Sequence, residues 1–464
     1  MPARTAESMT VFDPSDGTQV GTARLCGADD IGRAVAAARS AAPGWERLGA
    51  TGRHEIVSAA VARALPTAPE LAELQSREMG QPVALALPLA AASVQGLAHA
   101  TEQALSYPFV TQLGGSTQVL RRPRGVGALI TPWNFPLPTA LGGLAALLAA
   151  GNTVVWKPSE LCPLSALAVT EALALPEGVL TVVTGDGSTG QLLAEHPGVD
   201  ITVFTGSVPS GRLIGRTSGE LLRPSVMELG GKDPVIVDEG VDVEAAARTV
   251  AFGAFWNSGQ VCTSMERIYV HRALADTFLE ALVTETENLR VGSPLDPATQ
   301  IGPLAGPAQR RSVQRYLDDA LARGARVLNH VADVRDDHCW MPPMVLTGID
   351  DDMLLATEEV FGPLAPVQTV NDVDEAIRRA QDGAFGLGAT ILSNNPDTIE
   401  RAAELPAAIV WVNEWQGGAP GMTYEPVRQS GVGAVGSLDS VTRPMTVHAS
   451  EDPPGSPLLA TWYS

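Results

Sequence analysis

Cysteine is scarce in this sequence of 464 residues, which contains only Cys26, Cys162, Cys262 and Cys339. No two of them stand close enough in the chain for the short spacing of a structural zinc site, so no metal site is expected. Unpaired cysteines at such wide spacing fit a reducing compartment better than the disulfide framework of a small secreted domain. The sequence therefore predicts a cytoplasmic location.

Positive charge is also in short supply. Lys and Arg number 31 against 52 Asp and Glu, which gives a formal net charge of −21. A surface of this charge repels nucleic acid, and no basic stripe runs along the chain. The densest basic run is Arg121-Arg122-Pro123-Arg124, which we interpret as part of a hairpin that faces solvent or another subunit. We therefore expect no nucleic-acid partner.

The sequence lacks an uninterrupted apolar run long enough to cross a membrane. Residues 1–23 mix charge, Pro and Gly, so a secretion signal is not expected. Residues 125–156 carry no charged side chain and are long enough to span a bilayer. Pro132, Pro136 and Pro138 interrupt this run, and each would break a spanning helix. A buried strand, a turn and a buried helix explain the run better, and no membrane partner is expected.

The remaining composition describes a globular chain. Hydrophobic residues make up 45% and charged residues 18% of the sequence, and a chain of this length is expected to form two or three domains. Residues 29–104 predict an all-helical lead-in, with an acidic cap at Asp29 and breaks at Pro66, Gly80 and Pro82. A hairpin over 107–119, turning at Gly114-Gly115, follows these helices.

From residue 125 onward, short apolar strand-like runs alternate with helical runs. This alternation predicts a parallel sheet covered by helices on both faces, the architecture that binds dinucleotides at the carboxyl ends of its strands. A second α/β unit follows, and the chain closes with extended segments at 407–413 and 441–449. We therefore expect an α/β fold with a Rossmann-like parallel-sheet cofactor domain, a second α/β domain and a small, exposed β arm. The strands expected in the first sheet are 127–130, 153–156, 179–183, 201–204 and 225–229.

Two segments carry reactive side chains. Cys262 lies in the run Trp-Asn-Ser-Gly-Gln-Val-Cys-Thr-Ser at 256–264, where a turn after a helix frees backbone N–H groups around the sulfur, as a nucleophile requires. From this segment alone, the alternative that Cys262 is a small buried hydrophobe stays open. Glu228 ends an apolar run just before Gly230-Gly231. A carboxylate at such a tight turn can activate water or accept a proton from a thiol.

Together with Thr131-Pro132-Trp133-Asn134-Phe135-Pro136, these segments resemble the aldehyde dehydrogenase superfamily. The resemblance covers nearly the whole chain, and the motifs occur in the family's order and spacing. It implies oxidation of a small-molecule aldehyde to the carboxylic acid, with Cys262 as nucleophile, Asn134 as oxyanion clamp and Glu228 as the general base that hydrolyses the thioester. Members of the family that pass the acyl group to coenzyme A lack this acid, so a free carboxylic acid is the expected product.

The resemblance also divides the chain. It implies an NAD(P)-binding domain at 1–105 and 126–229, a catalytic domain at 230–423, and an oligomerisation arm with a C-terminal segment at 106–125 and 424–464. In the family the last strand and the hairpin extend the sheet of a neighbouring subunit. A homodimer or homotetramer is therefore expected.

Several glycine-rich turns are candidates for the cofactor. Gly185, Gly187 and Gly190 form a Gly-x-Gly-x-x-Gly pattern, which is a weak signal by itself. The resemblance instead puts the pyrophosphate at 204–207, where a helix begins and free N–H groups favour an anion, although Ser207 can equally be a simple N-cap. Glu160 would repel a 2′-phosphate, so NAD is preferred and NADP remains possible. The full set implied is Thr131, Pro132, Trp133, Lys157, Ser159, Glu160, Gly187, Phe204, Gly206, Ser207, Leu229, Gly230, Glu359 and Phe361.

The sequence departs from the family at two places. Many members carry a lysine nine positions after the clamp asparagine, and here that position is Gly143. The late motif, aromatic-Gly-Gly-x-Lys-x-Ser-Gly followed by Gly-Arg-Glu, reads Tyr-Glu-Pro-Val-Arg-Gln-Ser-Gly from Tyr424 to Gly431 and lacks the Arg-Glu pair. A proton relay behind Glu228 is the function that these changes put in doubt, and slow thioester hydrolysis is one expected consequence.

The substrate itself is open. Candidates for the tunnel wall are largely apolar or aromatic, which favours an aliphatic or aryl aldehyde. Two other classes of function also remain open. A catalytically weak or structural member of the fold would explain the two departures, and a cofactor-independent thiol hydrolase or esterase would need a histidine beside Cys262, although none of the seven histidines falls in a familiar motif. The tunnel candidates are Phe135, Trp256, Val261, Thr263 and Trp415, with Met422 and Tyr424 beside them.

Overall fold

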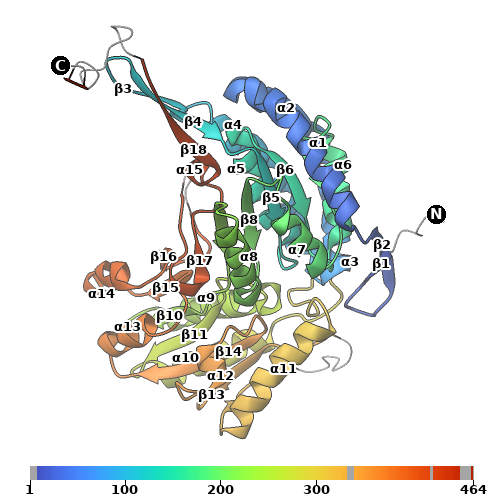
Figure 1. The fold of residues 1–464 in the computed structure, drawn as a ribbon. Coiled ribbons are helices and arrows are strands. Elements are labelled where there is room, and N and C mark those ends of the chain that lie inside the picture. Colours follow the sequence, from blue (N-terminus) through green and yellow to red (C-terminus); the bar gives the residue numbers. More distant parts are fainter. Residues whose placement is uncertain (1–7, 332–338, 419–421, 450–460, 463–464) are drawn as a thin grey trace.

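The computed structural model describes residues 8–331, 339–418, 422–449 and 461–462. Two large sheets, each with helices packed on it, make up most of the molecule (Figure 1). A thin three-stranded arm projects beyond them, and a short hairpin lies at the opposite side, near the N-terminus. The α/β fold predicted from the sequence is confirmed.

The first sheet has the strand order β17-β9-β8-β5-β6-β7. Five of these strands are parallel. The chain passes from β5 through β6 to β7 on one side, and then adds β8 and β9 on the other side of β5, so that the strand order reverses between β5 and β8. A dinucleotide binds at such a reversal point, outside the carboxyl ends of the strands. The strands are β5 (Val126–Ile130), β6 (Thr153–Lys157), β7 (Leu180–Val182), β8 (Ile201–Thr205), β9 (Ser225–Glu228) and β17 (Gly431–Val432).

Both faces of this sheet are covered, which explains why β5 and β6 read as continuous apolar runs. Leu129 points to the face packed by α5 (Pro136–Ala150) and α6 (Pro163–Leu173), together with the lead-in helices. Its neighbours Ala128 and Ile130 point to the opposite face, covered by α1 (Ala28–Arg47), α7 (Gly187–Glu195) and α8 (Val208–Glu220). The two-residue period of a strand therefore divides one apolar run between two cores.

The helical lead-in predicted over residues 29–104 is confirmed. A hairpin of β1 (Ser8–Phe12) and β2 (Gln19–Arg24), which was not predicted, precedes these helices. The acidic cap predicted at Asp29 was wrong, because Gly27 is the N-cap of α1 and the Asp30 carboxylate accepts a hydrogen bond from its N–H at 3.1 Å. The helices that follow are α2 (Gly49–Ala64), the 3₁₀ turn η1 (Leu65–Thr67), α3 (Ala68–Met79) and α4 (Val83–Gln103).

Helix α4 is long and apolar enough to cross a membrane by length and composition alone. A core helix of a water-soluble protein meets the same criterion. Ala86, Ala90, Val94 and Leu97 lie on one side of α4 and pack into the core shared with α5. This buried stripe accounts for much of its apolar character.

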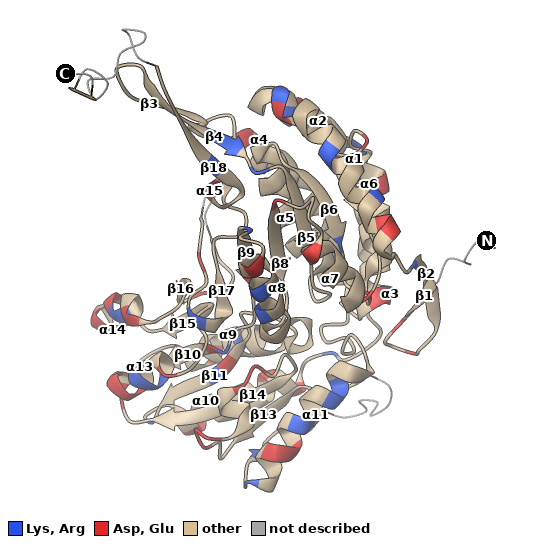
Figure 2. Ribbon diagram, in the orientation of Figure 1, with Lys and Arg blue, Asp and Glu red and all other residues tan. Residues whose placement is uncertain are grey.

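The second sheet has the order β12-β13-β14-β11-β10-β15-β16 and is parallel except for its edge strand β12. Helices α9 and α10 cover one face, and α13 covers the other. Charged residues of both signs are interspersed along the outer helices α11 and α13 (Figure 2). The strands are β10 (Asp233–Val237), β11 (Met265–His271), β12 (Arg326–Val327), β13 (Met344–Thr347), β14 (Leu364–Val370), β15 (Gly388–Leu392) and β16 (Ile409–Val412), and the helices are α9 (Val243–Phe255), α10 (Ala275–Glu287), α11 (Pro307–Ala322), α12 (Leu354–Thr357), α13 (Val373–Gln381) and α14 (Pro396–Glu400).

The projecting arm consists of β3 (Val110–Gly114), β4 (Thr117–Pro123) and β18 (Thr442–His448), which follows the short helix α15 (Leu438–Val441). β4 is the central strand and pairs antiparallel with both neighbours. The basic run 121–124 is engaged within the chain, because Arg121 pairs with Asp439 at 2.9 Å and Arg122 pairs with Glu46. The predicted hairpin is confirmed, and its second strand, β4, extends four residues further than expected.

Candidate active site

A cavity of about 1510 Å³ opens along the carboxyl ends of β5, β6, β8 and β9 and continues to the second sheet. Its volume exceeds the range of about 300–1,000 Å³ that is typical of small-molecule pockets. Every residue predicted to be catalytic or to bind the cofactor lines it, together with Phe135. Trp256, Val261, Thr263 and Trp415 do not line it. No histidine lines this cavity within the described part of the chain, which leaves the thiol-hydrolase alternative without the partner that it needs.

Two helix N-termini open onto this cavity. Ser207 is the N-cap of α8, and its Oγ accepts a hydrogen bond from Ser210 N at 3.4 Å. Asp186 caps α7 by accepting from Ser188 N at 2.8 Å. Position 206 requires a glycine, because a Cβ there would lie 2.6 Å from the Phe204 ring. The N-cap interpretation of Ser207 is therefore confirmed, and the free N–H groups of α8 lie beside it.

Lys157 and Glu160 meet at the end of β6, as predicted. Lys157 Nζ lies 3.4 Å from Glu160 Oε2. The lysine side chain is 5% exposed, whereas the glutamate is 50% exposed and reaches into the cavity. Ser159 Oγ lies 3.5 Å from the same carboxylate oxygen. The Glu160 carboxylate therefore lies at the carboxyl edge of the sheet, where the buried ammonium group of Lys157 pairs with it.

Cys262 is presented by an unusual turn at the end of α9. Three consecutive residues of the 3₁₀ turn η2 (Trp256–Gly259) are left-handed, with φ of 52° at Asn257, 58° at Ser258 and 71° at Gly259. Left-handed Asn and Ser cost conformational energy that the surroundings must offset. Ser258 Oγ donates to Gly302 O at 2.8 Å. A Cβ on Gly259 would lie 2.2 Å from Gly362 O, so only glycine fits there.

Asn134 is tied to the same turn. Its Nδ2 donates to Gln260 O at 3.0 Å, while Asn257 Nδ2 donates back to Asn134 O at 2.9 Å. Gln260 in turn accepts from Ala305 N at 2.9 Å. These buried contacts fix the loop that carries Asn134 against the turn that carries Cys262, although the two residues are far apart in the sequence.

The thiol of Cys262 lies among carboxylates. Burial raises its pKa well above the ordinary value, and Glu228, Asp233 and Glu359 raise it further. These surroundings favour the thiol over the thiolate, so that the sulfur must lose its proton before it can act as a nucleophile.

Glu228 ends β9 and is 9% exposed. Burial raises the pKa of this carboxyl, and a hydrogen bond from Tyr424 Oη at 3.0 Å acts in the opposite direction. The sequence placed Tyr424 among the residues near the tunnel and did not anticipate this contact. An aromatic residue at the start of the late motif was the available signal, but the partner of its hydroxyl depends on the fold.

The double glycine after Glu228 allows two close approaches. A Cβ on Gly230 would lie 2.1 Å from Glu359 Oε2, and one on Gly231 would lie 2.3 Å from Cys262 O. Gly231 N donates to Glu359 Oε1 at 3.1 Å. Burial, followed by the charge of Glu266, raises the pKa of Glu359 to about 8. The Gly-Gly string thus brings the candidate base, the candidate nucleophile and Glu359 to one place.

Phe361 and Trp133 meet across this cavity from the two sheets. Their rings are perpendicular, with centroids 5.4 Å apart. Phe361 is left-handed, with φ of 56°. Glu266, which was not predicted, holds that conformation by accepting from Val360 N and Phe361 N, both at 2.8 Å.

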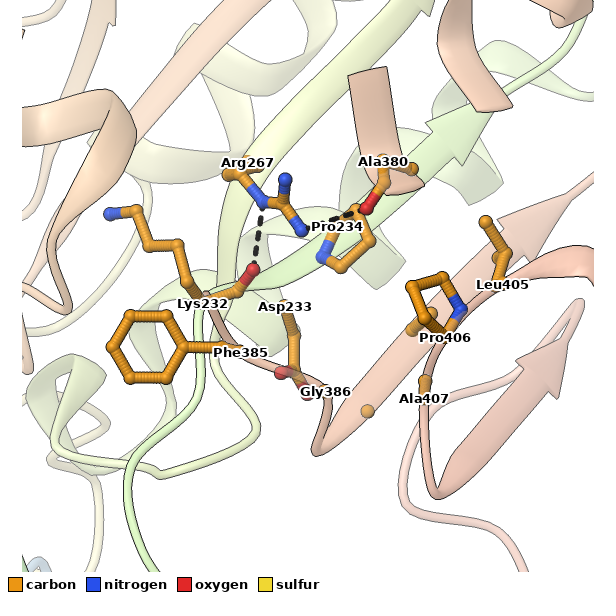
Figure 3. Close-up of a pocket in the computed structure, with 12 residues that line it drawn as sticks. Lys232, Asp233, Pro234, Arg267, Ala380, Phe385, Gly386, Leu405, Pro406 and Ala407 are labelled. Atoms are coloured by element: carbon orange, nitrogen blue, oxygen red, sulfur yellow. Dashed lines mark hydrogen bonds between the residues drawn. The ribbon is translucent and has the colours of Figure 1, made fainter. Parts of the chain in front are cut away.

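Behind these residues lies a buried ion pair that sequence reasoning also missed. Lys232 Nζ is 2.8 Å from Glu266 Oε2, and the two side chains are 2% and 3% exposed. Arg267 Nε donates to Lys232 O at 2.8 Å and its guanidinium reaches Ala380 O at 3.1 Å (Figure 3). Lys232 follows the double glycine in the sequence, but its partner lies on a neighbouring strand, so no local pattern indicated the pair.

Replacing Lys232 by methionine is expected to lower the free energy of unfolding by about 3–5 kcal/mol, because it leaves the Glu266 carboxylate buried without its counter-ion. Urea denaturation followed by tryptophan fluorescence measures the change. The matched control is Arg216→Met, which breaks the exposed pair with Glu220 at 2.9 Å and should cost no more than about 1 kcal/mol. Equal losses in the two variants would contradict the prediction.

Three of the predicted tunnel residues, Phe135, Trp256 and Trp415, form an aromatic cluster. Ring centroids lie 5.1 Å apart for Phe135 and Trp256, and 5.6 Å apart for Trp256 and Trp415. Phe252 of α9, which was not predicted, joins both tryptophans. Trp415 Nε1 donates to Thr263 O at 3.1 Å, immediately after Cys262. The cluster therefore lies beside residues that flank Cys262 and Asn134.

The two departures from the family motifs have structural explanations. Gly143 faces the sheet, where a Cβ would lie 2.9 Å from Leu129 Cδ1, so a larger residue would have to displace the core. In the late loop, Glu425 Oε1 accepts from Gly433 N at 3.0 Å, and Arg428 donates to Gln381 O and Gly383 O, both at 2.8 Å. The loop therefore keeps its own set of contacts without the usual Arg-Glu pair.

Comparison with known proteins agrees with this geometry. The profile of the aldehyde dehydrogenase family matches residues 1–449. An NAD-dependent aldehyde dehydrogenase from Sinorhizobium meliloti is 32% identical, with a TM-score of 0.93 over 97% of this chain and 93% of that chain. The NAD⁺ complex of an aldehyde dehydrogenase from Bacillus cereus is 30% identical, with a TM-score of 0.92 over 96% and 94%. An indole-3-acetaldehyde dehydrogenase in complex with NAD⁺ is 33% identical, with a TM-score of 0.91 over 96% and 94%.

Proposed function

Since the chain belongs to the aldehyde dehydrogenase family, we propose that it oxidises an apolar aldehyde to the carboxylic acid through a thioester on Cys262, with NAD as acceptor. The observation that carries this proposal is the convergence of Cys262, Glu228 and Asn134 on one cavity that also receives the N-terminus of α8. These three residues come from three separate parts of the chain.

The residues around the cavity fit a dinucleotide. The start of α8 offers N–H groups to a pyrophosphate, and the bare Gly206 beside them allows close approach. Lys157, Ser159 and Glu160 would hold the adenosine ribose, and the Glu160 carboxylate favours NAD over NADP because it repels a 2′-phosphate. When bound, NAD supplies the acceptor for the hydride. The other residues proposed to hold it are Thr131, Pro132, Trp133, Gly187, Phe204, Ser207, Leu229, Gly230, Glu359 and Phe361.

In the first step the Cys262 thiol gives up its proton to water, and the sulfur adds to the aldehyde carbon to form a thiohemiacetal, so that negative charge develops on the former aldehyde oxygen. The same carbon then gives up its hydride, which leaves a thioester on Cys262. The Asn134 amide has two N–H donors. Its bond to Gln260 O uses one of them and holds the side chain in place. The second N–H and the Cys262 backbone N–H would then stabilise the oxyanion, a contribution of about 3 kcal/mol per donor.

Hydrolysis completes the cycle. Glu228 accepts a proton from water as that water attacks the thioester carbonyl, and the C–S bond then breaks to release the acid and restore the Cys262 thiol. The step requires Glu228 as a carboxylate. Because burial raises the pKa of this group, the fraction of Glu228 present as the carboxylate rises with pH over a range that lies above that of an ordinary glutamate.

The aromatic cluster supports an apolar aldehyde as substrate. Phe135, Trp256 and Trp415 carry no formal charge and lie beside the residues that flank Cys262. An aliphatic or aryl aldehyde would bury its chain or ring against them. We further propose a cytoplasmic homo-oligomer, either a dimer or a tetramer, in which the arm of β3, β4 and β18 contacts a neighbouring subunit, and the domain division given above.

A panel of aliphatic, aryl and charged aldehydes, offered with NAD and with NADP, tests the proposal. Reduced nicotinamide is followed by absorbance and the acid product by chromatography. We expect apolar aldehydes with NAD to give the highest kcat/KM, and one acid to be formed for each NADH. Absence of NADH with every aldehyde would overturn the proposed reaction, and a preference for charged aldehydes would overturn the proposed substrate class.

A further inference from the structure

The late loop that departs from the family pattern folds back onto the strand that carries the candidate base. We propose that Tyr424 is the positioning residue of Glu228, whose carboxylate it holds by a hydrogen bond from its hydroxyl during hydrolysis of the thioester. This inference rests on the proposed function and deepens it. It assigns the support of Glu228 to Tyr424.

The backbone explains why Tyr424 arrives at this position. β17 pairs antiparallel with β9, with Gly431 opposite Glu228 and Val432 opposite Met227. Leu229 N donates to Ser430 O at 2.8 Å. A Cβ on Gly431 would lie 2.1 Å from Met227 O, so glycine is required for this approach. The loop is thus anchored directly beside Glu228, on residues flanking the base on both sides.

The loop is also anchored away from β9. Ser430 Oγ accepts from Gly386 N at 2.9 Å, and Gln429 N donates to Ala384 O at 3.0 Å. Arg428, at a left-handed φ of 55°, donates to two carbonyls of the same region. With both sides tied to the folded core, the Tyr424 hydroxyl lies 3.0 Å from Glu228 Oε1.

The charges around the pair favour a tyrosine that donates and a glutamate that accepts. Burial and the neighbouring Glu228 and Cys262 raise the pKa of Tyr424, so its hydroxyl keeps its proton. Burial raises the pKa of Glu228, and the Tyr424 hydrogen bond is what lowers it. The other carboxylates here, Asp233 and Glu359, act on the Cys262 thiol.

The hydrogen bond from Tyr424 sets the direction in which the pH dependence of hydrolysis should change. A hydrogen bond to the carboxylate form keeps the pKa of Glu228 lower than burial alone would set it. Loss of the hydroxyl therefore raises that pKa, leaves less base at a given pH, and moves the acidic limb of the hydrolysis profile to higher pH. A merely structural role for Tyr424 would reduce the rate by the same factor at every pH.

Tyr424→Phe removes the hydroxyl and keeps the ring. With an aldehyde that the wild type oxidises, we expect the first-turnover burst of NADH to be retained, steady-state kcat at neutral pH to fall roughly 10- to 100-fold, the range set by a hydrogen bond to a charged group, and the acidic limb of the kcat profile to move upward. The matched control is Tyr107→Phe, which removes a hydroxyl that donates to Asp439 at 2.6 Å on the arm. It should leave the profile unchanged.

A second measurement does not depend on turnover. The carboxylate band of Glu228, isolated as the infrared difference between the wild type and Glu228→Gln, should titrate at higher pH when Tyr424→Phe is present in both proteins. An unchanged infrared titration, or a kcat profile that superimposes on that of the wild type, would overturn the role of Tyr424. A wild type that makes no NADH would instead overturn the proposed function, while the infrared titration would still decide the hydrogen bond.

Discussion

Replacing Cys262 by alanine is expected to lower NADH formation from an aldehyde by roughly 10⁴-fold or more, the scale on which removal of a covalent nucleophile acts. Without the sulfur no thiohemiacetal forms, and a free aldehyde is a poor hydride donor. The turn that carries Cys262 is held by contacts of Asn257, Ser258 and Gly259, so the substitution should leave the fold intact. Steady-state absorbance and a thermal unfolding curve together measure both effects.

The control for this experiment is Cys26→Ala. Cys26 is a free cysteine outside the cavity, packed against the core between α1 and the first sheet, and its loss should change kcat less than about twofold. If the Cys262 variant kept its activity, or if both variants lost it equally, Cys262 would not be the nucleophile.

Replacing Glu228 by glutamine is expected to separate the two half-reactions. The first turnover should still give about one NADH per active site, whereas steady-state kcat should fall about 10²- to 10⁴-fold, the usual contribution of a general base. The acyl group then accumulates on Cys262, where intact-mass spectrometry and peptide mapping detect it. Stopped-flow absorbance measures the burst.

The outcome that would contradict this role is loss of the burst itself. Glu228 would then be needed before hydride transfer, as the acceptor of the thiol proton, and the base that activates water would have to be sought elsewhere. Glu102→Gln serves as the control, because Glu102 is an exposed residue of α4, 67% accessible and far in sequence from the cavity residues. It should behave as the wild type.

The parallel strands of the first sheet could be predicted from the sequence because they are buried on both faces. A strand of that kind is a short and largely apolar run, and β5, β6 and β8 all show this pattern. The hairpin of β1 and β2 was missed for the opposite reason. Most of its residues are exposed or half-buried, so little in its composition distinguishes a strand from a loop.

The candidate cofactor and catalytic residues could also be predicted from the sequence. Each lies in a short string at the end of a strand or the start of a helix, and the strings place Asn134, Glu228 and Cys262 at the positions that the structure brings together. The residues that support them could not be predicted. Glu266 holds Phe361 and pairs with Lys232, but neither partner lies near it in the sequence, so no local pattern indicated its role.

By itself, the sequence determined the kinds of reactive group in this protein and the local turns that present them. The turn before Cys262 and the double glycine after Glu228 are visible in a few adjacent residues, whereas the left-handed conformation of that turn depends on contacts with Asn134 and Gly302. Only the tertiary structure decided which side chains support those groups. The contact between Tyr424 and Glu228 joins residues 196 positions apart, and it exists because β17 pairs with β9. That pairing is set by the order of strands in the sheet and the path of the late loop, which no local pattern of residues encodes.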